Sequence, residues 1–199
     1  MRSLIGKKIG MSQMFLEDGT VIPITVIEVG NNIVVQVKTK DKDGYDAVQV
    51  GAGSKKKISK ALKGHLKNLG SFGVLKEFKP DQEMKSGETL NASVFSEGDT
   101  VKISGVSKGK GFQGGVKRHG FAGMPASHGH HSVMRHGGSI GQRFPQHTLK
   151  GMRMPGRMGG AKSSVRGLKV VKVDAEKGLI AVRGAVPGNP GSYVQISSQ

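Results

Sequence analysis

TVIPITVIEV, at residues 20–29, is followed after Gly30-Asn31-Asn32 by IVVQVK at residues 33–38. Both runs are rich in β-branched residues, which fit the pleated surface of a sheet. Gly-Asn-Asn is a turn sequence, and Asp18-Gly19 predicts a second turn before the first run. The two runs therefore predict neighbouring strands in an antiparallel arrangement.

A further strand is predicted for YDAVQV at residues 45–50, after the turn sequence Asp43-Gly44. Pro23 cannot donate a hydrogen bond to a neighbouring strand, so we expect its strand to be at an edge or bulged there. The first fifty residues together predict four short antiparallel strands.

The pattern changes after Ser54. Ile58, Leu62, Leu66 and Leu69 recur at helical spacing with lysines on the other faces, which predicts a short amphipathic helix over residues 58–69. Lys55-Lys56-Lys57 before it is either a solvated surface or an RNA contact. Strands are expected at 74–78 and 89–95, so residues 54–97 form a small α+β insertion.

Strands are predicted again at residues 100–106, 168–173, 179–183 and 193–196. The chain therefore reads as a mainly β body that is interrupted once. We expect the body to comprise residues 1–106 and 168–199, with a long glycine-rich loop over residues 107–167 between its strands.

The composition excludes several classes of protein. The chain has 199 residues, enough for one domain or one domain with a large appendage, and no cysteine. It therefore has no disulfide framework, no thiolate zinc or iron–sulfur site and no cysteine nucleophile. Its net charge of +17 points to a polyanion, an acidic partner or a membrane surface.

The charge is concentrated in one part of the chain. Residues 1–99 hold 15 Lys and Arg against 12 Asp and Glu, a net of +3, and residues 174–199 are neutral. Residues 100–173 hold 14 cations and no acid, and with them six of the seven histidines. No apolar run approaches the 18 residues of a membrane span, and the start lacks a signal peptide. We expect a cytoplasmic or organelle-interior protein with no membrane partner, and cytoplasmic is the favoured location.

Two motifs resemble catalytic signatures without their context. Residues 109–114 satisfy G-x-G-x-x-G, but the dinucleotide fingerprint needs an acid about 20 residues later, and none occurs between Asp99 and Asp174. Gly137-Gly-Ser139-Ile-Gly141 satisfies G-x-S-x-G, but that mechanism needs an acid and then a histidine after the serine. Here the last histidine, His147, precedes the next acid.

Two further patterns also fall short of a site. Residues 151–157 resemble a phosphate-binding loop but lack its Lys-Ser/Thr pair. His128, His130, His131 and His136 could ligate zinc, although neighbouring cations disfavour it and contacts to RNA are the favoured reading. We therefore expect no enzyme, no catalytic residue, no cofactor, no metal and no small-molecule substrate.

The long loop has the chemistry of an RNA-binding segment. Half of the 32 glycines lie in residues 105–167, so the backbone can approach phosphates closely. Arginines can bind phosphates or stack on bases, and Phe and His can insert between bases. A solvated basic linker would more often be lysine-rich and lack Phe and Met. The predicted RNA-binding residues are Lys108, Lys110, Phe112, Lys117, Arg118, His119, Phe121, His128, His130, His131, Arg135, His136, Arg143, Phe144, Lys150, Arg153, Arg157, Lys162 and Arg166.

Several ordered motifs resemble the bacterial ribosomal protein L-three family. They include Gly6-Lys-Lys-Ile-Gly-Met11, Gly105-Val-Ser-Lys-Gly-Lys-Gly-Phe-Gln-Gly114, Gly138-Ser-Ile-Gly-Gln142 and Met154-Pro-Gly-Arg-Met-Gly159. Arg183-Gly-Ala-Val-Pro-Gly188 continues the resemblance, which covers essentially the whole chain.

The resemblance implies a translation-factor-like antiparallel β-barrel body and an extended loop that penetrates RNA. It implies direct, early binding to large-subunit ribosomal RNA of the 23S type, beside other ribosomal proteins. It also implies that the loop tip, near residues 128–146, approaches the peptidyl-transferase centre. Gln142 matches a glutamine that a methyltransferase N-methylates in some members. The alternative is a nucleic-acid-binding or RNA-chaperone protein that acts away from the ribosome.

Overall fold

The strands of this chain are joined in antiparallel pairs throughout the part that the structure describes. The structure is a computed structural model, and it describes residues 2–67, 69–79 and 84–199. Every strand pair within these residues is antiparallel. The prediction of a mainly β protein is therefore confirmed.

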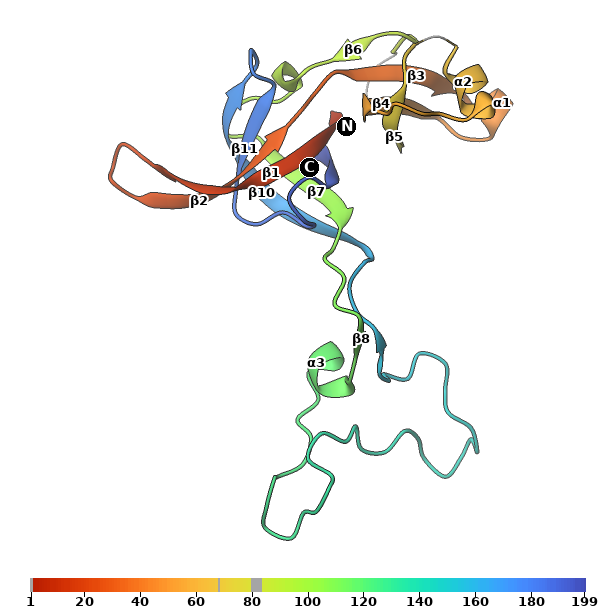
Figure 1. Cartoon of the computed structure of the whole chain (residues 1–199), viewed down its shortest axis with the longest axis vertical. Helices are drawn as coiled ribbons and strands as arrows, with labels where there is room; N and C mark the ends of the chain where they lie inside the picture. The colour runs from red at the N-terminus through yellow and green to blue at the C-terminus, as the bar shows by residue number, and fades with distance from the viewer. Residues whose placement is uncertain (1, 68, 80–83) are drawn as a thin grey trace. The chain divides into compact units, whose positions relative to one another are not determined.

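Six strands pair in a ring. In order of pairing they are β1 (Ser3–Phe15), β12 (Tyr193–Ser198), β7 (Thr100–Val106), β10 (Lys162–Asp174), β11 (Leu179–Arg183) and β2 (Val21–Glu28) (Figure 1). β2 then pairs with β1, so the sheet closes on itself. Closure leaves no strand edge along the ring itself, where another chain could add.

The inside of the ring is a core of aliphatic side chains. Residues at alternate positions of β7 point inward, as Val101 and Ile103 do, and both are fully buried. Leu4, Ile27 and Ile180 belong to the same cluster. The β-branched residues that predicted the strands are thus also the residues that fill the core.

A second sheet lies between β2 and β7 in the sequence. Its order is β5 (Phe72–Phe78), β4 (Ala47–Ser54), β3 (Asn32–Lys38) and β6 (Thr89–Leu90). A short helix, α1 (Lys40–Asp43), connects β3 with β4. Val34, Val48 and Val50 form the core of this sheet together with Ile5 of β1.

The second sheet starts earlier in the chain than the insertion predicted over residues 54–97. The prediction places β3 and β4 in the body, but among the described residues β3 pairs with β4 and β6 and with no strand of the ring. Alternation of side chains does not say which strand will be the neighbour, and here the hairpin of β3 and β4 pairs away from the ring.

Helix α2 (Lys60–Leu66) confirms the predicted amphipathic helix over a shorter range. Ser59 caps it, because its side chain accepts a hydrogen bond from the Leu62 N–H at 3.3 Å. Leu66 is buried against Val35 and Phe72. Asn68, within the predicted range, lies outside the described residues. In the described part of the chain, no helix is long and apolar enough to cross a membrane.

The strand predicted over residues 89–95 is wrong beyond Leu90. β6 ends there, and a 3-10 turn, η1 (Ala92–Val94), follows it. The turn directs Phe95 into the core of the ring, where its side chain is almost fully buried. The apolar residues after Leu90 are therefore buried by a turn and not by a longer strand.

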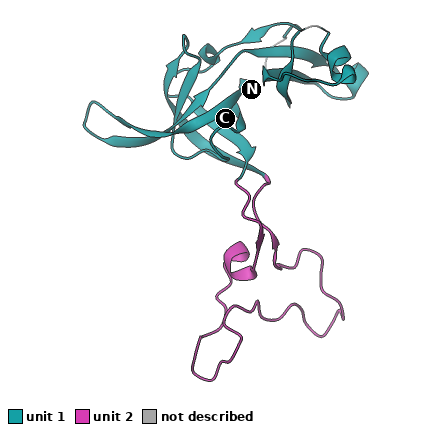
Figure 2. Cartoon of the chain, in the orientation of Figure 1, with its two compact units in different colours: residues 1–107, 162–199 teal, residues 108–161 magenta. Residues whose placement is uncertain are grey.

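The chain divides into two compact units (Figure 2). Unit 1 comprises the described residues of 1–107 and 162–199, and unit 2 comprises residues 108–161. β10 begins at Lys162, earlier than the strand predicted from residue 168, and Lys162 pairs with Val106. A bulge between Val165 and Leu168 interrupts the alternation of side chains, which explains why the sequence did not show this part of the strand.

Asn32 joins the ring to the second sheet. Its side chain is fully buried, accepts the Ile5 N–H at 2.9 Å and donates to the carbonyls of Ile5 at 3.0 Å and Gly30 at 2.8 Å. Its amide therefore satisfies the buried backbone groups of Ile5 in β1 and the carbonyl of Gly30.

We expect Asn32→Ala to lower the free energy of unfolding by roughly 2–4 kcal/mol, because the buried N–H and carbonyl of Ile5 lose their partner. Urea unfolding of the full chain measures this change. Asn31→Ala, at the exposed neighbouring position, is the control and should change stability by less than about 0.5 kcal/mol. Equal effects of the two substitutions would contradict the role of Asn32.

Candidate nucleic-acid interface

A short antiparallel ladder of backbone hydrogen bonds joins the first residues of unit 2 to its last residues. β8 (Phe112–Gln113) pairs with β9 (Gly156–Arg157). Next to this pair, the Lys110 N–H donates to the Met158 carbonyl and the Met158 N–H to the Gly111 carbonyl, both at 2.9 Å. The ladder brings residues more than 40 positions apart in the sequence into register, so the 42 residues between Gln113 and Gly156 form a closed segment.

A five-residue helix, α3 (Gly115–His119), follows β8 and contacts the segment just before β9. The Arg118 guanidinium donates to the Met154 carbonyl at 2.6 Å, and the His119 Nε2 lies 3.1 Å from the same oxygen. Phe121 packs on Gly115, whose missing side chain leaves room for the ring. These three predicted RNA-binding residues are therefore partly buried, and they hold unit 2 together.

A second closure lies at residues 124–134. The Met124 N–H donates to the Met134 carbonyl at 2.9 Å. Gly123 has a φ of +75°, and a Cβ there would lie 2.2 Å from that carbonyl, so the closure requires glycine. His128, His130 and His131 lie in the enclosed turn and are exposed. A hollow of about 690 Å³ adjoins it, lined by Met124, His130, Val133, Arg135, His136, Gly137, Gly138 and Pro155.

Gln142 lines another hollow. It has a volume of about 390 Å³, and its lining is Ser139, Gly141, Gln142, Pro145, His147, Leu149 and Met152. The side chain of Gln142 is exposed. Nearby, the Arg143 guanidinium lies 5.7 Å from the centre of the Phe144 ring, as in a cation–π pair. This part of unit 2 thus offers a concave surface with both apolar and polar groups.

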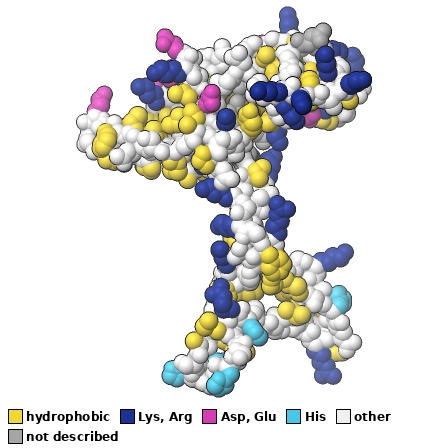
Figure 3. Space-filling model, viewed as in Figure 1, with side chains coloured by type: hydrophobic (Ala, Val, Ile, Leu, Met, Phe, Trp, Pro, Cys, Tyr) yellow, Lys and Arg dark blue, Asp and Glu magenta, His cyan; other side chains and the backbone are white. Residues whose placement is uncertain are grey.

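The remaining predicted residues share one property, which is exposure to solvent. Two of them, Lys162 and Arg166, lie on β10 in unit 1. The others lie in unit 2 and are Lys108, Lys110, Phe112, Lys117, His128, His130, His131, Arg135, His136, Arg143, Phe144, Lys150, Arg153 and Arg157. Figure 3 shows lysine, arginine and histidine side chains on the surface of this unit.

Unit 2 lacks a core of its own. All its residues are described, and Gly115 is the one buried residue among them. Phe112 is 76% exposed and Phe144 is 65% exposed. Backbone hydrogen bonds and glycine turns therefore give this unit its form, and its large apolar side chains remain available to a partner.

The catalytic alternatives find no support in the geometry. The hydroxyl of Ser139 donates to the carbonyl of Gly141 at 2.7 Å, within its own turn. Ser139 lies in irregular structure and not on the strand-to-helix turn of a nucleophile elbow. Within the described residues, no group of three or more His, Asp or Glu is placed to hold a metal.

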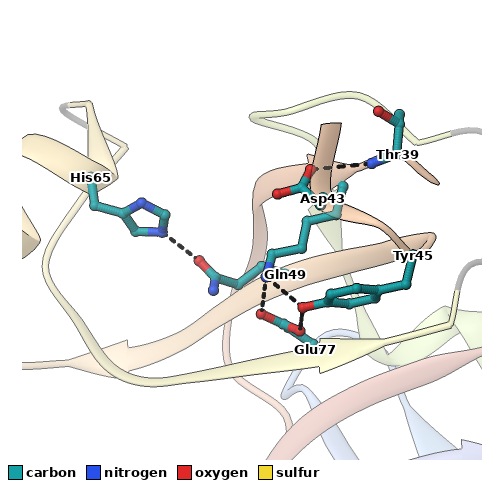
Figure 4. A network of polar contacts seen from close by, with 7 residues as sticks. Thr39, Asp43, Tyr45, Gln49, His65 and Glu77 are labelled. Carbon is teal, nitrogen blue, oxygen red and sulfur yellow. Dashed lines mark hydrogen bonds and ion pairs between the residues drawn. The ribbon is translucent and has the colours of Figure 1, made fainter. Parts of the chain in front are cut away.

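A network of polar side chains lies on the second sheet (Figure 4). The Lys38 ammonium lies 2.8 Å from the Glu77 carboxylate and donates to the Tyr45 hydroxyl, which donates to Glu77. The hydrogen bond from Lys38 is the main cause that lowers the pKa of Glu77, and the hydrogen bond from Tyr45 is the next largest. The hydrogen bond to Glu77 in turn raises the pKa of Lys38. Both groups therefore stay charged at neutral pH, and the network connects β3 to β5 without a group poised for proton transfer.

Comparison with known proteins identifies the family. A family model described as ribosomal protein L3 matches residues 47–184, more than half of the chain. The chain belongs to the ribosomal protein L3 family. This membership confirms the resemblance found in the sequence motifs.

Curated members are similar over nearly their whole length. The large ribosomal subunit protein uL3 of Heliobacterium modesticaldum is 47% identical over 203 residues, which cover 99% of this chain and 96% of that protein. The protein of the same name from Chloroherpeton thalassium is 47% identical and covers 98% of each chain. That of Finegoldia magna is 43% identical and covers 98% of this chain and 97% of its own. These relatives are named as ribosomal proteins and not as enzymes, in agreement with the sequence prediction.

Some residues of the interface were missed by the sequence reasoning. Met124, Val133, Leu149, Met152 and Pro155 line the two hollows, and the carbonyl of Met154 anchors α3. The unusual apolar content of an otherwise polar loop was the signal that could have found the side chains. A backbone carbonyl gives no signal in the sequence.

Gly159 provides a test of the ladder. Its φ is +71°, and a Cβ there would lie 2.0 Å from the Lys108 carbonyl. We expect Gly159→Ala to open the ladder, because the added methyl clashes with backbone and alanine is strained at this φ. Trypsin should then cleave at Lys110 and Arg157 several-fold faster.

Gly109→Ala is the matched control. Gly109 lies beside the same ladder, but a Cβ there would meet nothing within 4 Å, so its cleavage rate should not change. Equal cleavage of both variants would show that the ladder does not depend on Gly159.

Proposed function

We propose that this chain is a structural constituent of the large ribosomal subunit and that it binds large-subunit ribosomal RNA directly through unit 2. The observation that carries the proposal is that unit 2 exposes eight of its nine lysines and arginines, all but the partly buried Arg118, in a segment with no acidic residue. Family membership supports it, because the relatives are named as large-subunit proteins. Other proteins of the subunit would be its neighbours.

Two physical terms favour RNA as the partner. Each phosphate that a lysine or arginine neutralises releases counterions, which is a favourable entropy change. Exposed rings of Phe112 and Phe144 and the exposed histidines can stack on unpaired bases. Because residues 100–173 contain no acid, no side chain in this part of the chain repels the phosphates.

Binding and ordering are coupled in this proposal. Unit 2 has one buried residue and no hydrophobic core, so its conformation gains little stability from its own packing. RNA that fills the two hollows would supply the missing contacts. In this proposal RNA stabilises unit 2, and unit 2 stabilises the fold of the RNA. Such mutual stabilisation is suited to an early step of subunit assembly.

The family resemblance extends the proposal in three respects. The six-stranded ring would be the translation-factor-like barrel of the family. The loop tip, near residues 128–146, would approach the peptidyl-transferase centre. Gln142, which is exposed, would be a site of N-methylation by a glutamine methyltransferase. A peptide that contains Gln142 at its unmodified mass, taken from native subunits, would contradict the last point.

Three exposed arginines of unit 2 allow a direct test. We expect the triple variant Arg135→Gln, Arg143→Gln, Arg153→Gln to bind a large-subunit rRNA fragment at least tenfold more weakly at low salt. The slope of log affinity against log salt concentration should fall by about 2 to 3, because three phosphate contacts are lost. Filter binding over a series of KCl concentrations measures both quantities.

The control removes the same charge from unit 1. Lys42→Gln, Lys169→Gln, Lys177→Gln changes three exposed lysines and should leave affinity within about twofold. Equal losses in the two triple variants would mean that net charge, and not unit 2, governs binding. A cellular pool of the wild-type protein entirely outside ribosomal fractions would favour the extraribosomal alternative.

A further inference from the structure

The hairpin of β1 and β2 has a charge pattern opposite to that of unit 2. Residues 9–37 contain no lysine, arginine or histidine, although the whole chain carries a net charge of +17. They contain three acids, and two of these, Glu17 and Asp18, lie at the tip of the hairpin. A cation-free stretch of this length in so basic a protein is unsuited to contact with RNA.

The same hairpin exposes a large apolar surface. Cross-strand partners share a face, and Phe15 is paired with Val21 and Gln13 with Pro23. Met11 lies two residues before Gln13 on this face. Phe15 is 65% exposed, Met11 is 54% exposed and Val21 is 48% exposed, and Leu16 adds to the patch at the turn. We call the surface formed by Met11, Gln13, Phe15, Val21 and Pro23 the hairpin face.

The hairpin face is hollowed and lies beside open strand edges. A depression of about 520 Å³ is lined by Met11, Ser12, Gln13, Val21 and Pro23. β12 pairs with β1 only as far as Lys7, and β11 pairs with β2 only from Ile24. Among the described residues, no strand other than its hairpin partner pairs with residues 10–15 or 21–23. The hairpin thus continues beyond the closed ring with backbone groups that can accept a partner.

Hydrogen bonds close the tip of the hairpin, and one of them holds the carboxylate of Asp18. The Leu16 N–H donates to the Thr20 carbonyl at 2.9 Å, and the Asp18 carboxylate accepts the Thr20 N–H at 2.9 Å. This hydrogen bond from the Thr20 backbone lowers the pKa of Asp18. Asp18 is therefore ionised at neutral pH, and Glu17 beside it is exposed.

We propose that the hairpin face is a docking surface for a second protein, one that presents apolar side chains to the depression and lysine or arginine to Glu17 and Asp18. The acids select the partner, because they would repel RNA phosphates and attract a basic protein surface. The exposed apolar side chains gain free energy when another protein covers them. Pro23 limits the ladder of β2, so a strand added by the partner would pair with the open edge of β1 at residues 10–15.

A photo-crosslinking experiment in assembled large ribosomal subunits tests this docking surface. The experiment rests on the proposed function in one respect, because it assumes that the chain is part of these subunits. A benzophenone amino acid replaces Phe15 of the full chain. The cells that make this variant contain no other protein of the L3 family. Large subunits are purified and irradiated, and the crosslinked product is identified by peptide sequencing. We expect a single peptide of another protein, with lysine or arginine close to the crosslinked residue.

The same probe at Phe112 of unit 2 separates this inference from the proposed function. It should crosslink to ribosomal RNA. Failure at Phe112 together with a protein product at Phe15 would count against RNA binding by unit 2 and leave the docking surface standing. A product with RNA at Phe15, a product with a second copy of this chain, or no product at Phe15 would overturn the docking surface.

Charge variants test the role of the tip. Glu17→Lys with Asp18→Asn should lower the protein crosslink at Phe15 at least about fivefold, because the attraction to basic side chains is lost. Asn at position 18 can still accept the Thr20 N–H, so the turn is kept. The control Glu176→Lys with Asp41→Asn makes the same change of charge at exposed positions elsewhere in unit 1. Equal crosslink yields in the two variants would overturn the proposed recognition of a basic surface.

Discussion

The pairing of β7 with β10 holds the ring together at the point where the long insertion leaves it. It joins Val106 to Lys162, so the chain leaves the ring and returns to it at adjacent positions. β12 pairs with the other edge of β7, which fixes that strand between two neighbours. A segment of 54 residues can therefore be inserted at this point without opening the ring. The body keeps its closed sheet and its aliphatic core whatever the inserted unit contacts.

This separation lets the two units follow different rules of composition. Unit 1 buries its apolar residues in the ring and in the second sheet, as most globular domains do. Unit 2 has no core, no acid and many glycines, and its form depends on backbone hydrogen bonds. Such a segment would be unstable as an independent domain, but it gains contacts when a polyanion surrounds it. The outer part of the β1 and β2 hairpin, within the cation-free residues 9–37, extends the same division of charge to a third surface.

Much of the fold was predictable because most strands carry β-branched residues at alternate positions. β1 was less clear, since Gly6, Lys7, Lys8 and Gly10 interrupt the pattern, and pairing with β12 and β2 stabilises it instead. The assignment of β3 and β4 to a separate sheet could not be predicted, because a strand does not encode its distant neighbour. The start of β10 was hidden by the bulge before Leu168.

The chemistry of the interface was more predictable than its geometry. Residue types alone indicated exposed cations and aromatic rings, and sixteen of the nineteen predicted residues are exposed. Arg118, His119 and Phe121 were assigned to RNA from their type, but the structure places them in contacts within unit 2. The partner of Arg118 is a carbonyl 36 residues away, which no local pattern reveals. We infer that unit 1 folds without unit 2 and that unit 2 supplies the affinity for RNA.

Replacement of residues 108–161 by an Asn-Gly turn tests both parts of this inference, with urea unfolding and binding to an rRNA fragment measured on one preparation. We expect cooperative unfolding with a free energy within about 1 kcal/mol of that of the full chain, because distant sites contribute independently. We also expect RNA affinity to fall by about a hundredfold at low salt, since most of the phosphate contacts are removed. A shortened chain that does not fold, or that binds RNA within about twofold of the full chain, would contradict the inference.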